Sequence, residues 1–393
     1  MTSIRKNILY FYIAYVCMVI AIAFPHAVLT ILLLKKGLSI SQILIVQAAY
    51  SCAILISEYP SGVLADLYSK KRLFLVSKIC LIAMFLIIIG SKSFIFMVLA
   101  WILYGISSAL DSGTIDAEII NTLKQNNSAN KVPKFISNIN RLDFIALIIG
   151  GSVGSWLYYT VGIKFYYFSI FLVLLCMILI YRGYNGGSNV NTSKISSTNI
   201  AYQVKSGILE LKKSSVLRLM VYLTFTSQFF FQTHFQLWQA FFLSRNIHKE
   251  NFYIYYIVFQ VLSILAYSLN FRLNKRNTSI FYAICSVIMI IGILLIQNIN
   301  NVIFTISYSI LVCVFMSFDY FSNVLFSQNV SLENISSLTS LKSSCGRIAS
   351  LISLLISSTL LHKLNITLVV TLNFGFAIIA SIFILFIYLR KIA

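Results

Sequence analysis

The sequence predicts an all-α polytopic membrane protein with twelve transmembrane helices in two pseudo-symmetric six-helix bundles. Of its 393 residues, 59% are hydrophobic and only 10% are charged, a balance that no water-soluble domain needs. A helix of about 20 apolar residues crosses the hydrocarbon core of a bilayer, so this chain is long enough for twelve such spans joined by short loops. A single long polar segment near the middle of the chain separates two halves of similar pattern.

Apolar runs bounded by polar or glycine residues place the spans in order along the chain. The expected ranges are 8–34, 41–65, 73–90, 94–115, 136–159 and 165–181 in the first half, and 216–243, 251–271, 279–297, 302–327, 337–361 and 366–389 in the second. The first run is too long for a signal peptide and has no small-residue cleavage site, so we expect a retained helix that Pro25 loosens. The fourth is expected to continue as polar helix to Asn121.

The domain boundaries follow from the polar middle segment. We expect an N-terminal bundle at 1–182, a cytoplasmic linker at 183–215 with a short amphipathic helix near Ile208–Leu211, and a C-terminal bundle at 216–393. One constant shift along the sequence places Asp111 on Asp319 and His26 on His234, and a similar shift places Arg141 on Arg347. These matches predict a parallel repeat, a recurring design of transporters.

A net charge of +20 on its own would favour nucleic-acid binding, but the distribution of the cations argues against that function. Lys and Arg gather in short loops on one side of the expected spans, which the positive-inside rule assigns to the cytoplasm. Both termini are then cytoplasmic, in a multi-pass protein of the cell membrane. The seven cysteines contain no C-x-x-C pair and lie in or beside apolar runs, so neither a disulfide framework nor a metal site is expected.

A short loop between the second and third spans carries the most specific motif. Its residues are Gly62, Asp66, Lys70, Lys71 and Arg72. Glycine lets another helix approach closely, the carboxylate can pair with a cation or a helix N-terminus, and the cations anchor the loop on the cytoplasmic side. This loop resembles the signature G-x-x-x-D-R-x-G-R-K of the major facilitator superfamily, with Leu67 and Ser69 where the family favours Arg and Gly.

The resemblance implies a monomeric permease that moves a small molecule by alternating access and uses no cofactor. Members similar in the segment from Glu58 to Asp66 are mostly exporters of drugs, peptides or metabolites, and many are coupled to protons. A helix-four motif of proton-coupled members is partly present, but Trp101 stands where that motif has an arginine. Gly150–Gly154 resembles an antiporter motif without its proline. These departures leave coupling and direction open.

Ionisable residues inside predicted spans are costly and therefore mark candidate functional positions. They are Glu58, Asp111, Asp116, Glu118, Arg141, Asp143, Asp319 and Arg347. Most lie near the cytoplasmic edge. There they either form a gate network of ion pairs or extend their side chains to the lipid headgroups. The pairings we expect join Arg141 to Glu118 or Asp116, and Arg347 to Asp66 or Asp319. Because burial raises the pKa of a carboxyl group, Asp111 and Glu58 are the candidates for proton coupling.

A second set of candidates lies on the seventh span, where four glutamines share one side of the helix. They are Gln228, Gln232, Gln236 and Gln239, with Trp238 beside them. Amides among aromatic rings suit an amphipathic organic solute, although glutamines in membranes also bond helix to helix, and both interpretations stay open. His26, after Pro25, is a further candidate for the substrate cavity or a packing residue.

Three functions fit a chain of this kind. A secondary permease, most simply a proton-coupled exporter, accounts for the motif and the repeat; an uptake permease has the same sequence features. A transport-like protein that acts as a sensor or immunity factor is compatible with the degraded motif. A membrane enzyme is excluded by the lack of a catalytic constellation, and ATP-driven transport by the lack of a phosphate-binding loop. We therefore expect a small-molecule substrate, a lipid bilayer and protons as the partners.

Overall fold

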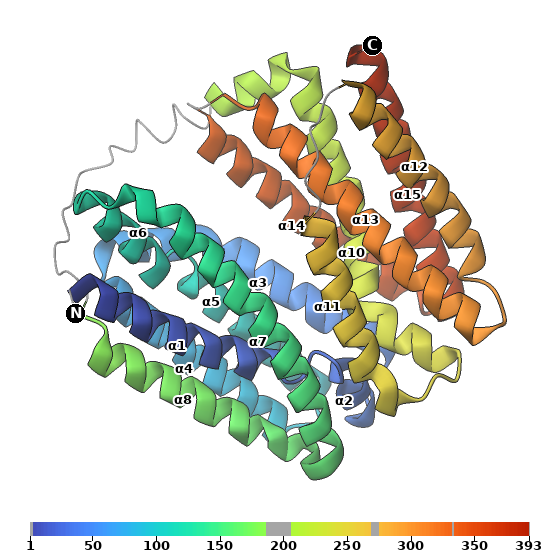
Figure 1. Cartoon of the computed structure of the whole chain (residues 1–393). Helices are drawn as coiled ribbons and strands as arrows, with labels where there is room; N and C mark the ends of the chain where they lie inside the picture. Colours follow the sequence, from blue (N-terminus) through green and yellow to red (C-terminus); the bar gives the residue numbers. More distant parts are fainter. Residues whose placement is uncertain (1–2, 186–205, 269–274, 332–333, 393) are drawn as a thin grey trace. The chain divides into compact units, whose positions relative to one another are not determined.

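The computed structural model describes residues 3–185, 206–268, 275–331 and 334–392, and the regular elements in these ranges are all helices. Twelve of these helices have 17 residues or more and follow the predicted order of spans (Figure 1). In the first half they are α1 (Ser3–Ala23), α3 (Ile40–Leu67), α4 (Lys70–Gly90), α5 (Phe94–Asp111), α7 (Val132–Val161) and α8 (Phe165–Gly183). In the second half they are α10 (Ser215–Ser244), α11 (Phe252–Ser268), α12 (Lys275–Leu295), α13 (Asn301–Asn329), α14 (Ile335–Leu360) and α15 (Ile366–Ile392).

The first predicted span is not one continuous helix. It consists of α1 and a shorter helix, α2 (Leu29–Lys35), separated by turns around Pro25. Proline lacks an amide hydrogen and its ring clashes with the preceding turn, so it kinks or breaks a helix in its interior. Pro25 was correctly expected to disturb this helix, but it interrupts the helix and does not merely loosen it. The Val28 amide donates to the Pro25 carbonyl oxygen (2.9 Å), a turn in place of a helical hydrogen bond.

The fourth predicted span is also broken, which the sequence analysis did not predict. Helix α5 ends at Asp111 and α6 (Ile115–Gln125) begins four residues later. Gly113 has a φ of +69°, in the left-handed region where glycine is favoured, and it stops the first helix as a C-terminal cap. The break gives α6 its own axis and rotation, so the side chains after Gly113 do not continue the face of α5.

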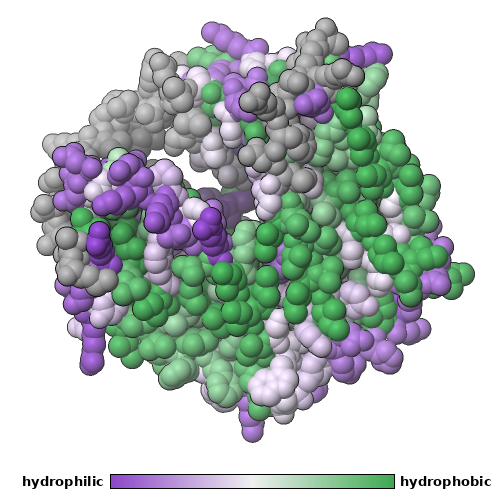
Figure 2. All heavy atoms as spheres, in the orientation of Figure 1, coloured by the Kyte–Doolittle hydropathy of each residue, from purple (hydrophilic) through white to green (hydrophobic). Residues whose placement is uncertain are grey.

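The described residues contain ten stretches long and apolar enough to cross a membrane, one of which, Ala129–Gly183, holds both α7 and α8. Helix α10, with its four glutamines, is not among them. Large apolar side chains stay exposed along one face of α7, at Ile145, Ile149 and Trp156, spaced by one or two turns. Figure 2 shows hydrophobic residues over the visible surfaces of α7 and α12, as helices that face lipid require.

Contacts divide the chain into two compact units. The first holds Met1–Thr192 with Lys249–Gln260, and the second holds Ser193–His248 with Val261–Ala393. In the first unit α1 packs against α7 and α8, while α5 packs against α3 and α4; in the second, α10 packs against α13, α14 and α15. The contact of α1 with α7 is especially close, since a Cβ added to Gly154 would lie 2.1 Å from the carbonyl oxygen of Phe24.

The predicted linker helix is present at 206–213 and is fixed to the second unit. The Glu210 carboxylate accepts hydrogen bonds from the Ser331 amide (2.9 Å), the Ser331 hydroxyl (2.6 Å) and the Asn334 side chain (2.6 Å), between α13 and α14. Desolvation alone would raise the pKa of the Glu210 carboxyl, but these hydrogen bonds outweigh it and hold that pKa below its ordinary value of 4.5.

This contact is expected to weaken in acid. Because the folded pKa of Glu210 is depressed, its stabilisation is fully present above pH 4.5 and is lost as the pH falls through the lower folded value. At neutral pH, Glu210→Gln removes the same charge, and hydrogen exchange at the Ser331 amide should rise about fivefold, the effect of losing about 1 kcal/mol. Lys212→Met, an exposed neighbour, should leave that exchange rate unchanged; equal rates in both variants would contradict the assignment.

Candidate functional site

A buried ion pair in the first unit is the strongest functional feature of the described residues. The Lys78 ammonium of α4 lies 2.9 Å from Oδ1 of Asp111, the last residue of α5. Lys78 is 1% exposed, and its ammonium also lies 4.3 Å from the centre of the Phe74 ring. A charge this deeply buried needs a counter-charge, because removing one partner leaves the other desolvated and uncompensated.

Asp111, at the end of α5 just before the break, lines a cavity, and Lys78 is not among the residues that line it. The side chain of Asp111 is 25% exposed, against 1% for its partner. The Thr114 hydroxyl donates to the Asp111 carbonyl oxygen (2.7 Å) and closes the turn between α5 and α6. This helix pair thus buries the cation and leaves the anion partly exposed.

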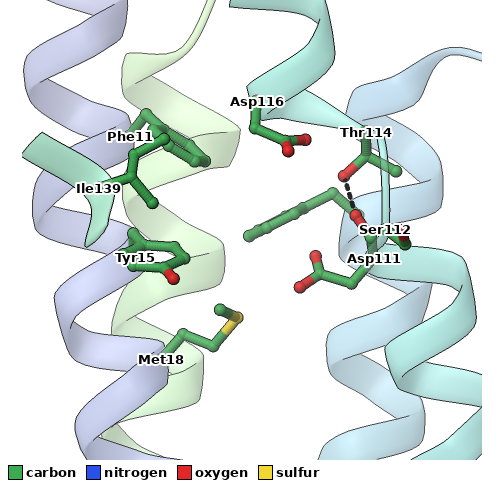
Figure 3. A pocket seen from close by; sticks show the side chains of 9 residues that line it. Phe11, Tyr15, Met18, Asp111, Ser112, Thr114, Asp116 and Ile139 are labelled. Carbon is green, nitrogen blue, oxygen red and sulfur yellow. Dashed lines mark hydrogen bonds between the residues drawn. The ribbon is translucent and has the colours of Figure 1, made fainter. Parts of the chain in front are cut away.

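Asp111 lines a cavity of about 170 Å³ together with residues of α1, α4, α6 and α7. Figure 3 shows Asp111 and Asp116 pointing into this space from one side, with Tyr15 and Met18 of α1 on the other. The Tyr15 hydroxyl donates to Oδ1 of Asp143 on α7 (2.8 Å), so a third carboxylate lies directly behind the wall. The cavity therefore brings together Asp111, Asp116 and, through Tyr15, Asp143.

The expected pairing of Arg141 with Glu118 or Asp116 was wrong. Arg141 is exposed and forms no ion pair with either carboxylate. Glu118 instead lies near the Tyr184 side chain, and the cations whose charges act on it are Lys70 and Lys71 of the signature loop. The rotation of α6 after its break turns Glu118 toward the end of α8 and away from α7.

The cationic loop between α3 and α4 caps the C-terminal end of α8. Lys71 donates to the carbonyl oxygens of Tyr181 (2.8 Å) and Tyr184 (2.7 Å), the last turn of α8, where carbonyl groups lack helical partners. Gly62 is exposed, and no described atom lies within 4 Å of the position its Cβ would take, so the expected close approach at Gly62 is not made. Arg72 is exposed, and the side chain of Asp66 lies outside the described part of the chain.

Removing the Lys71 cap should destabilise α8 locally. Lys71→Met deletes two charge-assisted hydrogen bonds and is expected to cost about 2 kcal/mol. Backbone amides near Tyr184 should then exchange hydrogen faster, together with a lower melting temperature of the purified protein. The exposed neighbour Arg72→Met is the matched control, and an equal change in both variants would refute the capping role.

The second unit holds its own charged group. Oδ2 of Asp319 on α13 accepts from the Asn323 amide (2.8 Å), and Oδ1 of Asn323 accepts from the Lys342 ammonium of α14. Lys342 is the cation whose charge acts on Asp319, and the Ser227 hydroxyl of α10, which donates to the Leu223 carbonyl oxygen (2.8 Å), lies near the same carboxylate. Lys342, and not Arg347, is thus the cation near Asp319, and the other partner expected for Arg347, Asp66, has its side chain outside the described part of the chain.

Two of the four glutamines on α10 bond to the neighbouring helix. The Ser350 hydroxyl of α14 donates to Gln228 (2.7 Å), and Gln232 donates to the same hydroxyl (3.1 Å). This supports the helix-to-helix interpretation for both of them. Gln239 and Trp238 are buried in the second unit, and Gln236 is half-buried.

The two membrane histidines each lie beside a tyrosine hydroxyl. Nδ1 of His26 is 3.4 Å from the Tyr256 hydroxyl in the first unit, and Nδ1 of His234 is 3.0 Å from the Tyr308 hydroxyl in the second. His234 is 2% exposed among aromatic rings, as a packing residue would be. Glu58, the other candidate for proton coupling, is an exposed residue of α3.

Sequence reasoning missed the two lysines that carry these sites, as well as Asn323 and Tyr15. The signal for Lys78 was available, because a single lysine inside the apolar run 73–90 has to find a counter-charge. The same signal was available for Lys342, which lies inside the predicted span 337–361, although the serine-rich stretch around it makes that span less apolar. Which carboxylate each lysine meets depends on helix rotation, which the sequence does not specify.

Comparisons with known proteins agree with this architecture. A family model described as Major Facilitator Superfamily matches residues 9–331. The sequence matches no curated protein. Among solved structures, a mutant form of the nucleoside transporter NupG has a TM-score of 0.77 at 13% identity, covering 96% of this chain and 99% of that one.

Two further solved structures are similar over almost their whole length. A D-xylose-proton symporter has a TM-score of 0.67 at 13% identity, covering 97% of this chain and 96% of that one. A bacterial homologue of the human lysosomal transporter Spinster has a TM-score of 0.68 at 10% identity, covering 98% and 95%. At these identities the likeness shows the fold alone. Because the family model spans most of the chain, the protein belongs to the Major Facilitator Superfamily, and it is a multi-pass membrane transporter and not an enzyme.

Proposed function

We propose that the protein exports a small organic solute across the cell membrane in exchange for protons, as a monomer with both termini in the cytoplasm. The observation that carries the proton part is the asymmetric pair of Lys78 and Asp111. The Asp111 carboxylate is partly exposed, so a proton can reach it while the buried Lys78 ammonium stays in place.

Protonation of Asp111 has a consequence that a surface carboxylate would not have. Once Asp111 is neutral, the Lys78 ammonium is left in a low-dielectric interior with no counter-charge, and this state is costly. The cost is lowered if Lys78 gains another anion, and Asp116 lines the same cavity. A proton thus shifts the balance between two arrangements of α4, α5 and α6, which is how a ligand drives a conformational change.

The solute is proposed to be a small metabolite or drug-like compound. A nucleoside transporter and a D-xylose-proton symporter are among the proteins of similar structure, so both classes of solute belong among the first compounds to test. Glu58 is retained as a second candidate for proton transfer, since it is an exposed carboxylate on a membrane helix. An uptake permease and a sensor without transport remain the alternatives that the experiment separates.

Transport is tested with the purified full-length protein in liposomes. Vesicles loaded with unlabelled uridine, D-xylose or a lipophilic drug are diluted into the labelled compound, and counterflow is measured against protein-free vesicles. At least one class should be exchanged about tenfold faster than in protein-free vesicles. If the folded protein exchanges none of them, the proposal of transport is contradicted and a sensor without transport is favoured.

A further inference from the structure

The linker helix at 206–213 lies at the level where membrane helices end. Its carboxylate side chain bonds to Ser331 and Asn334, in the connection between α13 and α14. One stretch apolar enough to cross a membrane, Asn301–Asn329, ends two residues before Ser331. Another, Leu338–Leu360, begins four residues after Asn334. Because the connection joins the ends of two such stretches, a helix bound to it lies at the membrane surface, among the lipid headgroups.

A cavity of about 510 Å³ lies between this helix and the first residues of α10 and α14. The residues that line it are Ser206, Leu209, Glu210, Lys213, Ser214 and Asn334. The first four follow the i, i+3, i+4, i+7 pattern of one helix face, and the last two are the N-cap residues of α10 and α14. The wall therefore holds one cation, one anion, three uncharged polar side chains and one apolar side chain.

The carboxylate in this wall is already engaged, whereas the ammonium has no ion-pair partner. Oε1 of Glu210 accepts from the Ser331 amide, and Oε2 accepts from the Ser331 hydroxyl and the Asn334 side chain. Lys213 is exposed and forms no ion pair within 4.0 Å with a residue that the structure describes. A ligand that enters the cavity therefore meets an available cation and an anion that is largely satisfied.

Further cations surround the cavity. Lys212 is exposed, and Arg218 of α10 donates to the carbonyl oxygens of Leu211 and Lys212 at the end of the linker helix. Counted over the sequence, the segments 205–218 and 331–334 hold four Lys or Arg and two Glu, a net charge of +2. This excess attracts an anion and favours an anionic headgroup over a zwitterionic one.

Exposed apolar side chains distinguish a lipid from a soluble anion as the occupant. Ile208 is 36% exposed and Leu209 is 47% exposed. Each lies four residues before a lysine, Lys212 or Lys213, so an apolar and a cationic side chain stand one turn apart on the same side of the helix. Helices that lie in the membrane interface have this pattern. A phospholipid covers the apolar pair with its acyl chains, whereas a soluble anion leaves that pair in water.

We propose that this cavity binds the headgroup of an anionic phospholipid of the surrounding bilayer. The phosphate pairs with Lys213 and accepts from the hydroxyls of Ser206 and Ser214, while the acyl chains extend along Leu209. A glycerol headgroup suits the rest of the cavity, because a carboxylate has about four acceptor positions and Glu210 uses three of them. The site binds lipid whether or not the protein transports a solute.

Binding is measured on the purified full-length protein by native mass spectrometry. The detergent contains equal amounts of phosphatidylglycerol, phosphatidylethanolamine and phosphatidylcholine with identical acyl chains. The wild-type protein should retain phosphatidylglycerol about fivefold more than either zwitterionic lipid, the ratio expected from one lysine at a bilayer surface. Glycerophosphoglycerol, the same headgroup without acyl chains, should leave this retention unchanged at about tenfold excess, because it makes no apolar contact.

Two lysines one residue apart supply matched variants. Lys213→Gln removes the charge inside the cavity and should bring the preference for phosphatidylglycerol close to one. Lys212→Gln removes an equal charge from a residue that does not line the cavity and should keep most of the preference. Lys213→Arg restores the charge and should restore the preference. The melting temperature without added lipid confirms that each variant is folded.

Three results would overturn the site. Equal retention of the three lipids by the wild-type protein would show that the cavity does not select an anionic headgroup. An equal loss of preference in Lys213→Gln and Lys212→Gln would show diffuse attraction to the helix without a bound phosphate. Displacement of the lipid by glycerophosphoglycerol would show that the cavity takes a soluble phosphate compound.

Discussion

Replacing Asp111 by Asn is expected to reduce solute transport driven by a pH gradient about 100-fold, equivalent to about 2.7 kcal/mol. Asparagine keeps an acceptor for the Lys78 ammonium but cannot take up or release a proton. Exchange of solute for solute needs no net proton movement, so it should stay within about threefold of wild type. The measurement compares gradient-driven flux with counterflow in the same preparation of liposomes.

A carboxylate in the same cavity supplies the control for this variant. Asp116→Asn changes the charge of the cavity by the same amount but leaves the Lys78–Asp111 pair intact. Its gradient-driven flux should fall far less than that of Asp111→Asn. Glu58→Gln tests the second candidate in the same assay. If Asp111→Asn keeps full gradient-driven flux while Glu58→Gln loses it, proton coupling belongs to Glu58 and the proposed role of Asp111 is wrong.

Replacing Lys78 by Met should lower the stability of the protein. The substitution leaves the Asp111 carboxylate without its only ion-pair partner within 4.0 Å among the described residues, and breaking a buried pair in this way costs about 3 kcal/mol or more. Methionine fills a similar volume, so a cavity contributes little to this loss. The melting temperature of the purified protein should fall markedly relative to wild type.

The double variant Lys78→Met/Asp111→Asn separates charge from packing. With both charges gone, no desolvated ion remains, and the double variant should be more stable than Lys78→Met alone by about 2 kcal/mol. It should still lack gradient-driven transport, because no proton carrier has been restored. Additive losses of stability in the two single variants would show that Lys78 and Asp111 do not interact in the membrane.

The sequence determined the number and order of spans because twelve apolar runs can be recognised without knowledge of packing. The short helix of the linker at 206–213 could be predicted for the same reason, from a local pattern. What could not be predicted is the break at Gly113, since a glycine inside an apolar helix is often tolerated and only the left-handed backbone of the fold shows that it ends α5.

The error in pairing Glu118 with Arg141 follows from that break. A continuous helix from 94 to 121 would have kept Asp111 and Glu118 in a fixed rotation and brought Glu118 toward Arg141 on α7. With α6 rotated independently, Glu118 lies near Tyr184, and Asp111 pairs with Lys78. Candidate residues can thus be found from their cost in a membrane, whereas their partners depend on rotations of whole helices that local sequence does not encode.

The most direct test of proton-coupled export is the pH inside sealed liposomes when a transported solute is added outside. A trapped pH-sensitive dye reports the lumen while solute entry is measured in parallel. Exchange of solute for protons predicts that the lumen becomes alkaline as solute enters with the wild-type protein, and that Asp111→Asn shows no such change. An acidic shift would mean that solute and protons travel together, and solute entry without any change of pH would contradict proton coupling altogether.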